Sequence, residues 1–100
     1  MRLKEGVKLA GIQPEIVLAL QIAEQIYKDY GVELVVTSLL DGKHSSPNSL
    51  HYVGKAADLR TRDILANRRE EIRKKLADAL GNEFDVILEA DHYHIEMDLK

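Results

Sequence analysis

A short segment near the C-terminus constrains the fold most strongly. Between residues 92 and 98 the side chains alternate strictly: His92, His94, Glu96 and Asp98 are polar, and Tyr93, Ile95 and Met97 are apolar. Successive side chains of a strand point to opposite faces of a sheet. The alternation therefore predicts a strand with one face packed on a core and a polar face left open.

The other expected elements complete a two-layer domain. We expect one helix from Pro14 to the residues before Gly31, because proline suits a first helical turn and glycine a left-handed helix end. A second helix is expected over 64–80 and strands over 32–37, 56–60 and 84–89, with a turn-rich loop over 39–50. The expected inward-facing helix residues are Ile16, Leu20, Ala23, Tyr27 and Tyr30 in the first helix, and Leu65, Ile72, Leu76 and Leu80 in the second. The predicted fold class is α+β, a small mainly antiparallel sheet with two helices on one face.

Composition restricts the function classes. A chain of 100 residues has room for one hydrophobic core, so we expect a single domain over 1–100 and a monomer. A net charge of -3 argues against nucleic acid as a partner, and no apolar run is long enough for membrane insertion. We also expect synthesis in the cytoplasm without a signal peptide, because charged residues interrupt the N-terminal segment. With no cysteine, any metal must be bound by His, Asp and Glu.

Two histidines and one aspartate are the candidate metal ligands. His51 precedes Asp58 by seven residues, and His94 lies on the expected C-terminal strand. Two imidazoles and a carboxylate form a recognised zinc-binding set when cysteine is absent. Asp58 lies in an apolar segment, where an acid needs a partner. The alternative is a structural bridge from Asp58 to Arg60 or His51, and the spacing alone leaves both interpretations open.

The segment from Ser49 to Asp58 resembles the SxHxxGxAxD motif of the zinc D-alanyl-D-alanine carboxypeptidase and L-alanyl-D-glutamate peptidase family. All five specified positions match, and residues 91–94 fit both the DxxH and the HxH form of the second motif. The resemblance implies one Zn²⁺ per chain, with His51, Asp58 and His94 as ligands. It also implies Asp91 as the catalytic carboxylate.

The resemblance predicts an enzyme, a zinc metallopeptidase that hydrolyses bonds in peptidoglycan stem peptides or cross-links. The zinc is expected on the open face of the sheet. Such a hydrolase of the short phage or prophage type, similar to an endolysin, would act at the cell wall. The alternative is an inactive zinc-binding module that binds cell-wall peptides or has a structural role.

Several further residues are assigned around this predicted zinc. His92 shares a strand face with His94 and is the candidate donor to a transition-state oxyanion. Glu89 is the candidate for orienting a metal ligand by a hydrogen bond. The chain lacks the arginine with which larger family members bind a substrate carboxylate, so the candidate substrate-binding residues, each also explicable without a substrate, are Lys43, Ser49, Arg60 and Arg62.

Overall fold

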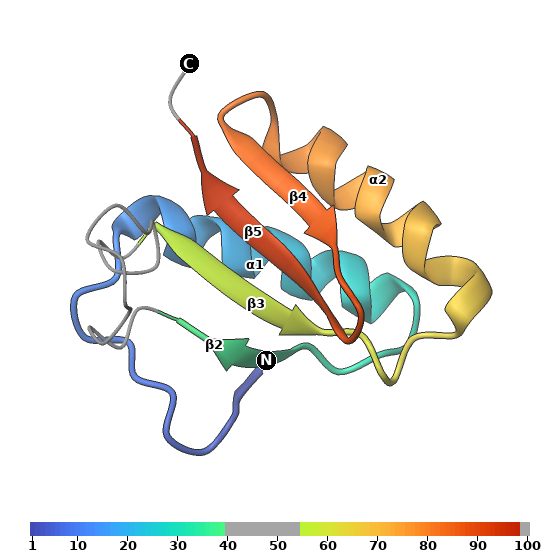
Figure 1. The fold of residues 1–100 in the computed structure, drawn as a ribbon, viewed down its shortest axis with the longest axis horizontal. Coiled ribbons are helices and arrows are strands. Elements are labelled where there is room, and N and C mark those ends of the chain that lie inside the picture. The colour runs from blue at the N-terminus through green and yellow to red at the C-terminus, as the bar shows by residue number, and fades with distance from the viewer. Residues whose placement is uncertain (40–54, 99–100) are drawn as a thin grey trace.

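The computed structural model describes residues 1–39 and 55–98 (Figure 1). Within these ranges the chain forms two α-helices, one 3₁₀ turn and a five-stranded sheet of order β1-β2-β3-β5-β4. The elements are β1 (Arg2–Leu3), α1 (Pro14–Asp29), β2 (Val35–Ser38), β3 (Ala56–Arg60), η1 (Ala66–Arg68), α2 (Arg69–Leu80), β4 (Phe84–Leu88) and β5 (His92–Met97). The α+β class is therefore confirmed.

The sheet is mixed, which corrects the expectation of a mainly antiparallel sheet. Strands β2, β3, β5 and β4 pair antiparallel, whereas β1 pairs in parallel with β2. Strand β1 was not predicted from the sequence, because a strand of two residues is too short to show an alternating pattern. The backbone amide of Arg2 donates to the carbonyl of Leu34, and that of Lys4 donates to Val36, which holds this segment at the edge of the sheet.

Both helices cover the same face of the sheet, and Figure 1 shows them behind the strands. The core lies between these two layers. Its helical side includes Ile16, Leu20 and Ala23 of α1, and its sheet side includes Leu59 and Ile95. The apolar residues of a helix repeat every three or four positions, and those of a strand every second position. These two spacings bring one face of each helix against one face of the sheet.

The second helix begins later than predicted. Leu65 is 73% exposed, so its prediction as an inward residue is wrong. Its backbone is extended and caps η1, and α2 begins at Arg69, so the helical spacing from Leu65 to Ile72 does not apply. Ile64 is buried in its place. Gly81 ends α2 with a φ of 85°, as expected of glycine after a helix.

Two buried tyrosines join the helical layer to the sheet. The Tyr27 hydroxyl donates to the backbone carbonyl of Arg60 at 2.8 Å, and the Tyr93 hydroxyl donates to that of Arg69 at 2.7 Å. Their rings meet edge to face with centroids 6.3 Å apart. Burial raises the pKa of both hydroxyls above the usual value, so both remain protonated donors.

Some expectations cannot be placed on this fold. The loop predicted over 39–50 lies, apart from Leu39, outside the described residues, as do Lys43, Ser49 and His51. Among the helices that the structure describes, none has the length and apolar character needed to cross a membrane.

Candidate metal and recognition site

The centre of the open sheet face carries Asp58 and His94. Strands β3 and β5 pair antiparallel with these two residues directly opposite each other. Because side chains alternate along both strands, the two groups project from the same face, away from the core. His94 Nδ1 lies 2.9 Å from Asp58 Oδ1, and both side chains are largely shielded from solvent.

His94 is held at both ring nitrogens. Its Nε2 lies 2.7 Å from Glu96 Oε1, two residues further along β5 on the same face. The hydrogen bond with Asp58, and to a smaller degree that with Glu96, raises the pKa of His94 to about 9, although partial burial opposes the charged form. The protonated imidazole is therefore favoured beside Asp58, and a metal ion bound at Nδ1 would take the place of that proton.

A second pair of a histidine and a carboxylate, His92 and Asp91, lies beside the Asp58–His94 pair. His92 Nδ1 is 2.5 Å from Asp91 Oδ1, and His92 Nε2 is 3.7 Å from Asp58 Oδ1. The hydrogen bond from His92 lowers the pKa of Asp91 below its usual value. Glu89 Oε1 lies 3.8 Å from His92 Nε2. Glu89 thus faces His92, and Glu96 occupies the orienting position beside His94 that was predicted for Glu89.

Glu96 is therefore the site residue that the sequence interpretation missed. The signal was present, because the alternation of residues 92–98 already placed Glu96 on the face of His94. Only the observed pairing shows that its carboxylate reaches the imidazole.

The described residues include two of the three predicted zinc ligands. Within residues 1–39 and 55–98, no three His, Asp or Glu side chains are grouped closely enough to bind a metal ion. Asp58 and His94 nevertheless fit two positions of a zinc shell, since one imidazole nitrogen faces a carboxylate and the other is hydrogen-bonded to Glu96. The third predicted ligand, His51, lies outside the described residues.

A cavity of about 660 Å³ adjoins this site. Asp58 and His92 line it, together with Thr37 and Ser38 of β2. Arg60 and Arg62, two of the predicted substrate-binding residues, also line it. Arg60 donates through Nε and Nη2 to Asp63 at 3.1 and 2.6 Å.

Comparison with known proteins places the chain in a family. A family model for the Hedgehog amino-terminal signalling domain matches residues 15–98, which include α2, α1 from its second residue onward, and the Asp58–His94 pair. The chain belongs to this family. No curated protein matches it.

Membership of the Hedgehog signalling family overturns the predicted function. The chain is not shown to be a member of the zinc carboxypeptidase family, and the predictions of a peptidoglycan hydrolase, of an enzyme and of a phage endolysin-like protein are wrong. The catalytic roles given to Asp91 and His92 lose their basis with that enzyme. The motif misled because it describes a set of ligands, and the same ligands suit a metal that takes part in no reaction.

The expected cellular location is corrected in the same way. Synthesis in the cytoplasm without a signal peptide conflicts with the family, because a Hedgehog signalling domain is normally a secreted extracellular protein.

Proposed function

We propose that this chain is a zinc-holding signalling domain that acts by binding a protein partner through the open face of its sheet. Family membership supports the signalling role. The observation that carries the proposal is the 2.9 Å approach of His94 Nδ1 to Asp58 Oδ1 on that face. The pair projects from the sheet face that neither α1 nor α2 covers, and Asp58 lines the adjoining cavity, so a partner can approach it there.

The proposed zinc ligands are His51, Asp58 and His94. Asp58 supplies the anionic donor, and His94 uses the nitrogen that faces it, while Glu96 retains the other ring nitrogen and fixes the orientation of the imidazole. When bound, zinc supplies a fixed positive charge at the centre of the open face. Asp91 and His92 form the adjacent rim, and their mutual hydrogen bond holds the histidine ring in place.

Metal content tests the zinc assignment. The wild-type protein should bind one zinc per chain, and His51→Ala, His94→Ala and Asp58→Asn should each lose most of it. His92→Ala is the matched control, because His92 lies on the same strand and face but pairs with Asp91. Elemental analysis after removal of free metal measures the content. Equal zinc in His92→Ala and His94→Ala would refute the assignment.

Selection from a displayed random-peptide library tests the binding role. The zinc-loaded protein should enrich peptides whose affinity falls when Asp58 is replaced by Asn. Peptides that bind the wild type and Asp58→Asn equally well would place recognition elsewhere on the molecule.

A further inference from the structure

Helix α1 is apolar on its outer side as well as on the side that faces the core. Leu18 is 59% exposed, and Val17 and Ile22 are each 37% exposed. Gln21 is the only polar residue over positions 16–23. A helix that is apolar all round is usually buried all round. Within the part of the chain that the structure describes, the outer side of α1 is nevertheless open to solvent and therefore to a partner.

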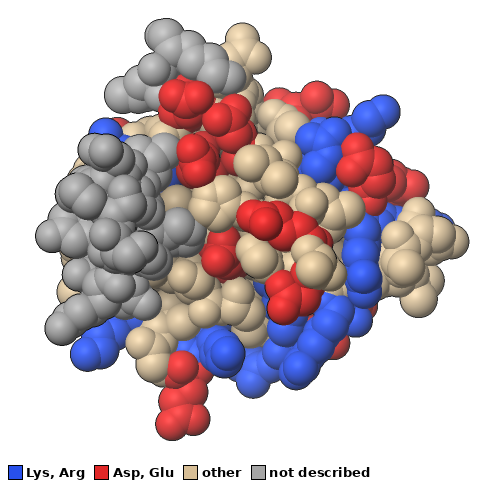
Figure 2. Space-filling model, viewed as in Figure 1, with Lys and Arg blue, Asp and Glu red and all other residues tan. Residues whose placement is uncertain are grey.

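Helix α2 and the open face of the sheet differ from α1, because both are charged. On α2, Glu70 pairs with Arg73, and Glu71 pairs with Arg68 of η1. Figure 2 shows Lys, Arg, Asp and Glu side chains spread over the open face of the sheet. Single exposed apolar residues are common on protein surfaces, but the three on the outer side of α1 lie close together and form a patch. Removing this patch from water is favourable.

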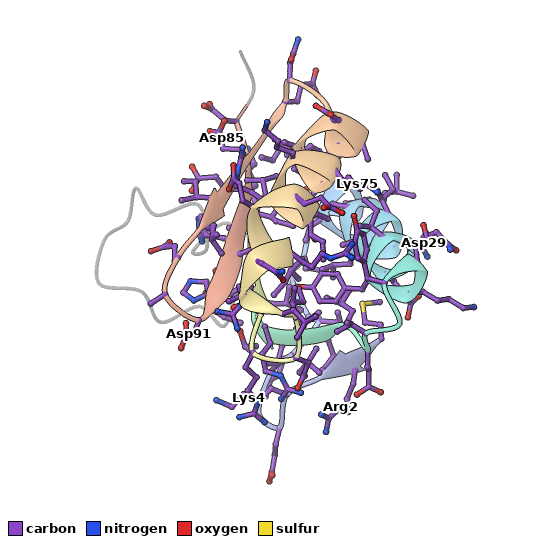
Figure 3. The ribbon with its side chains drawn as sticks, turned by 90° about the vertical axis from the view of Figure 1, so that its right-hand side faces the viewer. Arg2, Lys4, Asp29, Lys75, Asp85 and Asp91 are labelled. Carbon is purple, nitrogen blue, oxygen red and sulfur yellow. The ribbon has the colours of Figure 1, made fainter. Side chains whose placement is uncertain are left out.

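The surroundings of α1 leave room for one elongated partner along its outer side. Helix α2 packs against β4 at one edge of the sheet, and the N-terminal arm, residues 1–13, forms the opposite edge through β1. The arm reaches the flank of α1, where the amino group of Met1 pairs with Glu24. Figure 3 shows α1 on the side of the molecule away from β4 and β5, with Asp29 of its last turn pointing outward. A second helix can lie along this exposed ridge.

The two ends of α1 carry opposite charges. Glu15 lies in the first turn, and Lys28 lies in the last turn. Both side chains are exposed, and among the described residues neither forms an ion pair. At about 1.5 Å of rise per residue, the two charges are separated by about 20 Å along the helix. In an antiparallel pair of identical helices, each Glu15 therefore meets Lys28 of the second copy.

We propose that two copies of this chain associate through α1, with the two helices antiparallel about a two-fold axis beside Gln21 and Ile22. Leu18 and Ile22 of each copy pack against the helix of the other. The contacts between Glu15 and Lys28 at both ends set the direction of the pair. This inference depends neither on zinc nor on the open face, and it replaces the monomer that the chain length led us to expect.

Such a dimer leaves both recognition faces available. Figure 1 shows the two helices behind the strands, so pairing through α1 turns the open face of each copy outward. Two linked faces bind a partner with two sites more tightly than one face does.

Sedimentation velocity over a dilution series tests the dimer. The outer side of a helix about 24 Å long is smaller than the roughly 800 Å² per partner of a standard interface, so the dimer should dissociate on dilution. Leu18→Gln should raise the dissociation constant by about tenfold or more, because the symmetry removes two buried leucines. Leu65→Gln is the matched control, since Leu65 is 73% exposed but lies at the start of η1. It should associate as the wild type does.

A charge exchange tests the antiparallel arrangement. Glu15→Lys leaves both positions positive, and Lys28→Glu leaves both negative, so each variant alone should associate about tenfold more weakly. An equimolar mixture of the two variants should regain the association, because opposite charges then meet at both ends. Within one chain these charges are about 20 Å apart, beyond the Debye length of about 8 Å, so an effect inside one copy would not produce the recovery.

Three results would overturn the proposal. They are a monomer at every concentration, an unchanged dissociation constant in Leu18→Gln, and a mixture that associates no better than its components. Vesicles of neutral phosphatidylcholine test the other occupant of an apolar helix face. If the monomeric wild type pelleted with them and Leu18→Gln did not, the patch would bind lipid in place of a second copy. Circular dichroism checks that each variant keeps its helices.

Discussion

At the residue scale, the Asp58–His94 pair depends on a neighbour, Glu96, that is not itself a predicted ligand. Glu96 holds the imidazole nitrogen of His94 that faces away from Asp58. Such a partner fixes the ring orientation and increases the basicity of the ligand. The three polar groups lie together because the register of β3 and β5 places Asp58 opposite His94 and the period of a strand places Glu96 beside it.

Replacing Glu96 by alanine should therefore weaken zinc binding. We expect the zinc affinity to fall by roughly 10–100-fold, the range typical for loss of a group that orients a metal ligand. Competition with a chromophoric chelator measures this affinity. Asp98→Asn removes an acid two residues further along and should have little effect. An unchanged affinity in Glu96→Ala would show that His94 is oriented without this carboxylate.

The buried hydroxyl of Tyr27 contributes to the stability of the fold. Tyr27→Phe removes the donor to the Arg60 carbonyl and leaves a buried acceptor without it. The free energy of unfolding should fall by about 1–2 kcal/mol. Tyr30→Phe is the control, because the Tyr30 hydroxyl contacts the exposed side chain of Glu71. Urea unfolding compares the two variants, and an equal loss in both would contradict the role of Tyr27.

At the element scale, the sequence predicted the elements whose side-chain period is clear. Helix α1 and strand β5 lie where the spacing placed them, since their apolar residues repeat at helical or strand intervals, and β3 has the predicted bounds. The start of α2 was not predictable, because Leu65 continues the helical spacing of Ile72 and Leu76 although its own backbone is extended. Strand β1 depends on backbone hydrogen bonds to β2, which leave no side-chain pattern.

The attachment of β1 can be tested at one position. Lys4→Pro removes both the side chain and the amide that donates to the Val36 carbonyl, whereas Lys4→Ala removes the side chain only. The proline variant should lose about 1 kcal/mol of stability relative to the alanine variant, and its residues 1–5 should show lower heteronuclear NOE values. Identical NOE values in the two variants would show that the arm is held by other contacts.

At the scale of the whole molecule, the two layers separate stability from recognition. Both helices pack on one face (Figure 1), and the other face carries the Asp58–His94 pair. Lys and Arg side chains lie along the lower margin of that face (Figure 2). Composition could not predict this distribution, because a net charge of -3 averages over both faces. The motif could predict candidate ligands but not the function, since a zinc shell of the same residues serves proteins of different activity.

The proposed zinc site predicts how removal of the metal changes the thermal stability of the domain. In the proposed site, zinc would link Asp58 of β3, His94 of β5 and His51 only in the folded state, so it should stabilise that state by mass action. At a free zinc concentration of about 100 times the dissociation constant, the gain is about 2.7 kcal/mol, or roughly 10–20 °C in Tm for a domain of this size. Thermal unfolding with zinc and with chelator measures the difference. Asp58→Asn should show a much smaller shift, because a neutral amide replaces the anionic ligand. If chelator leaves the wild-type Tm unchanged, the helical layer and its core account for the stability without a metal.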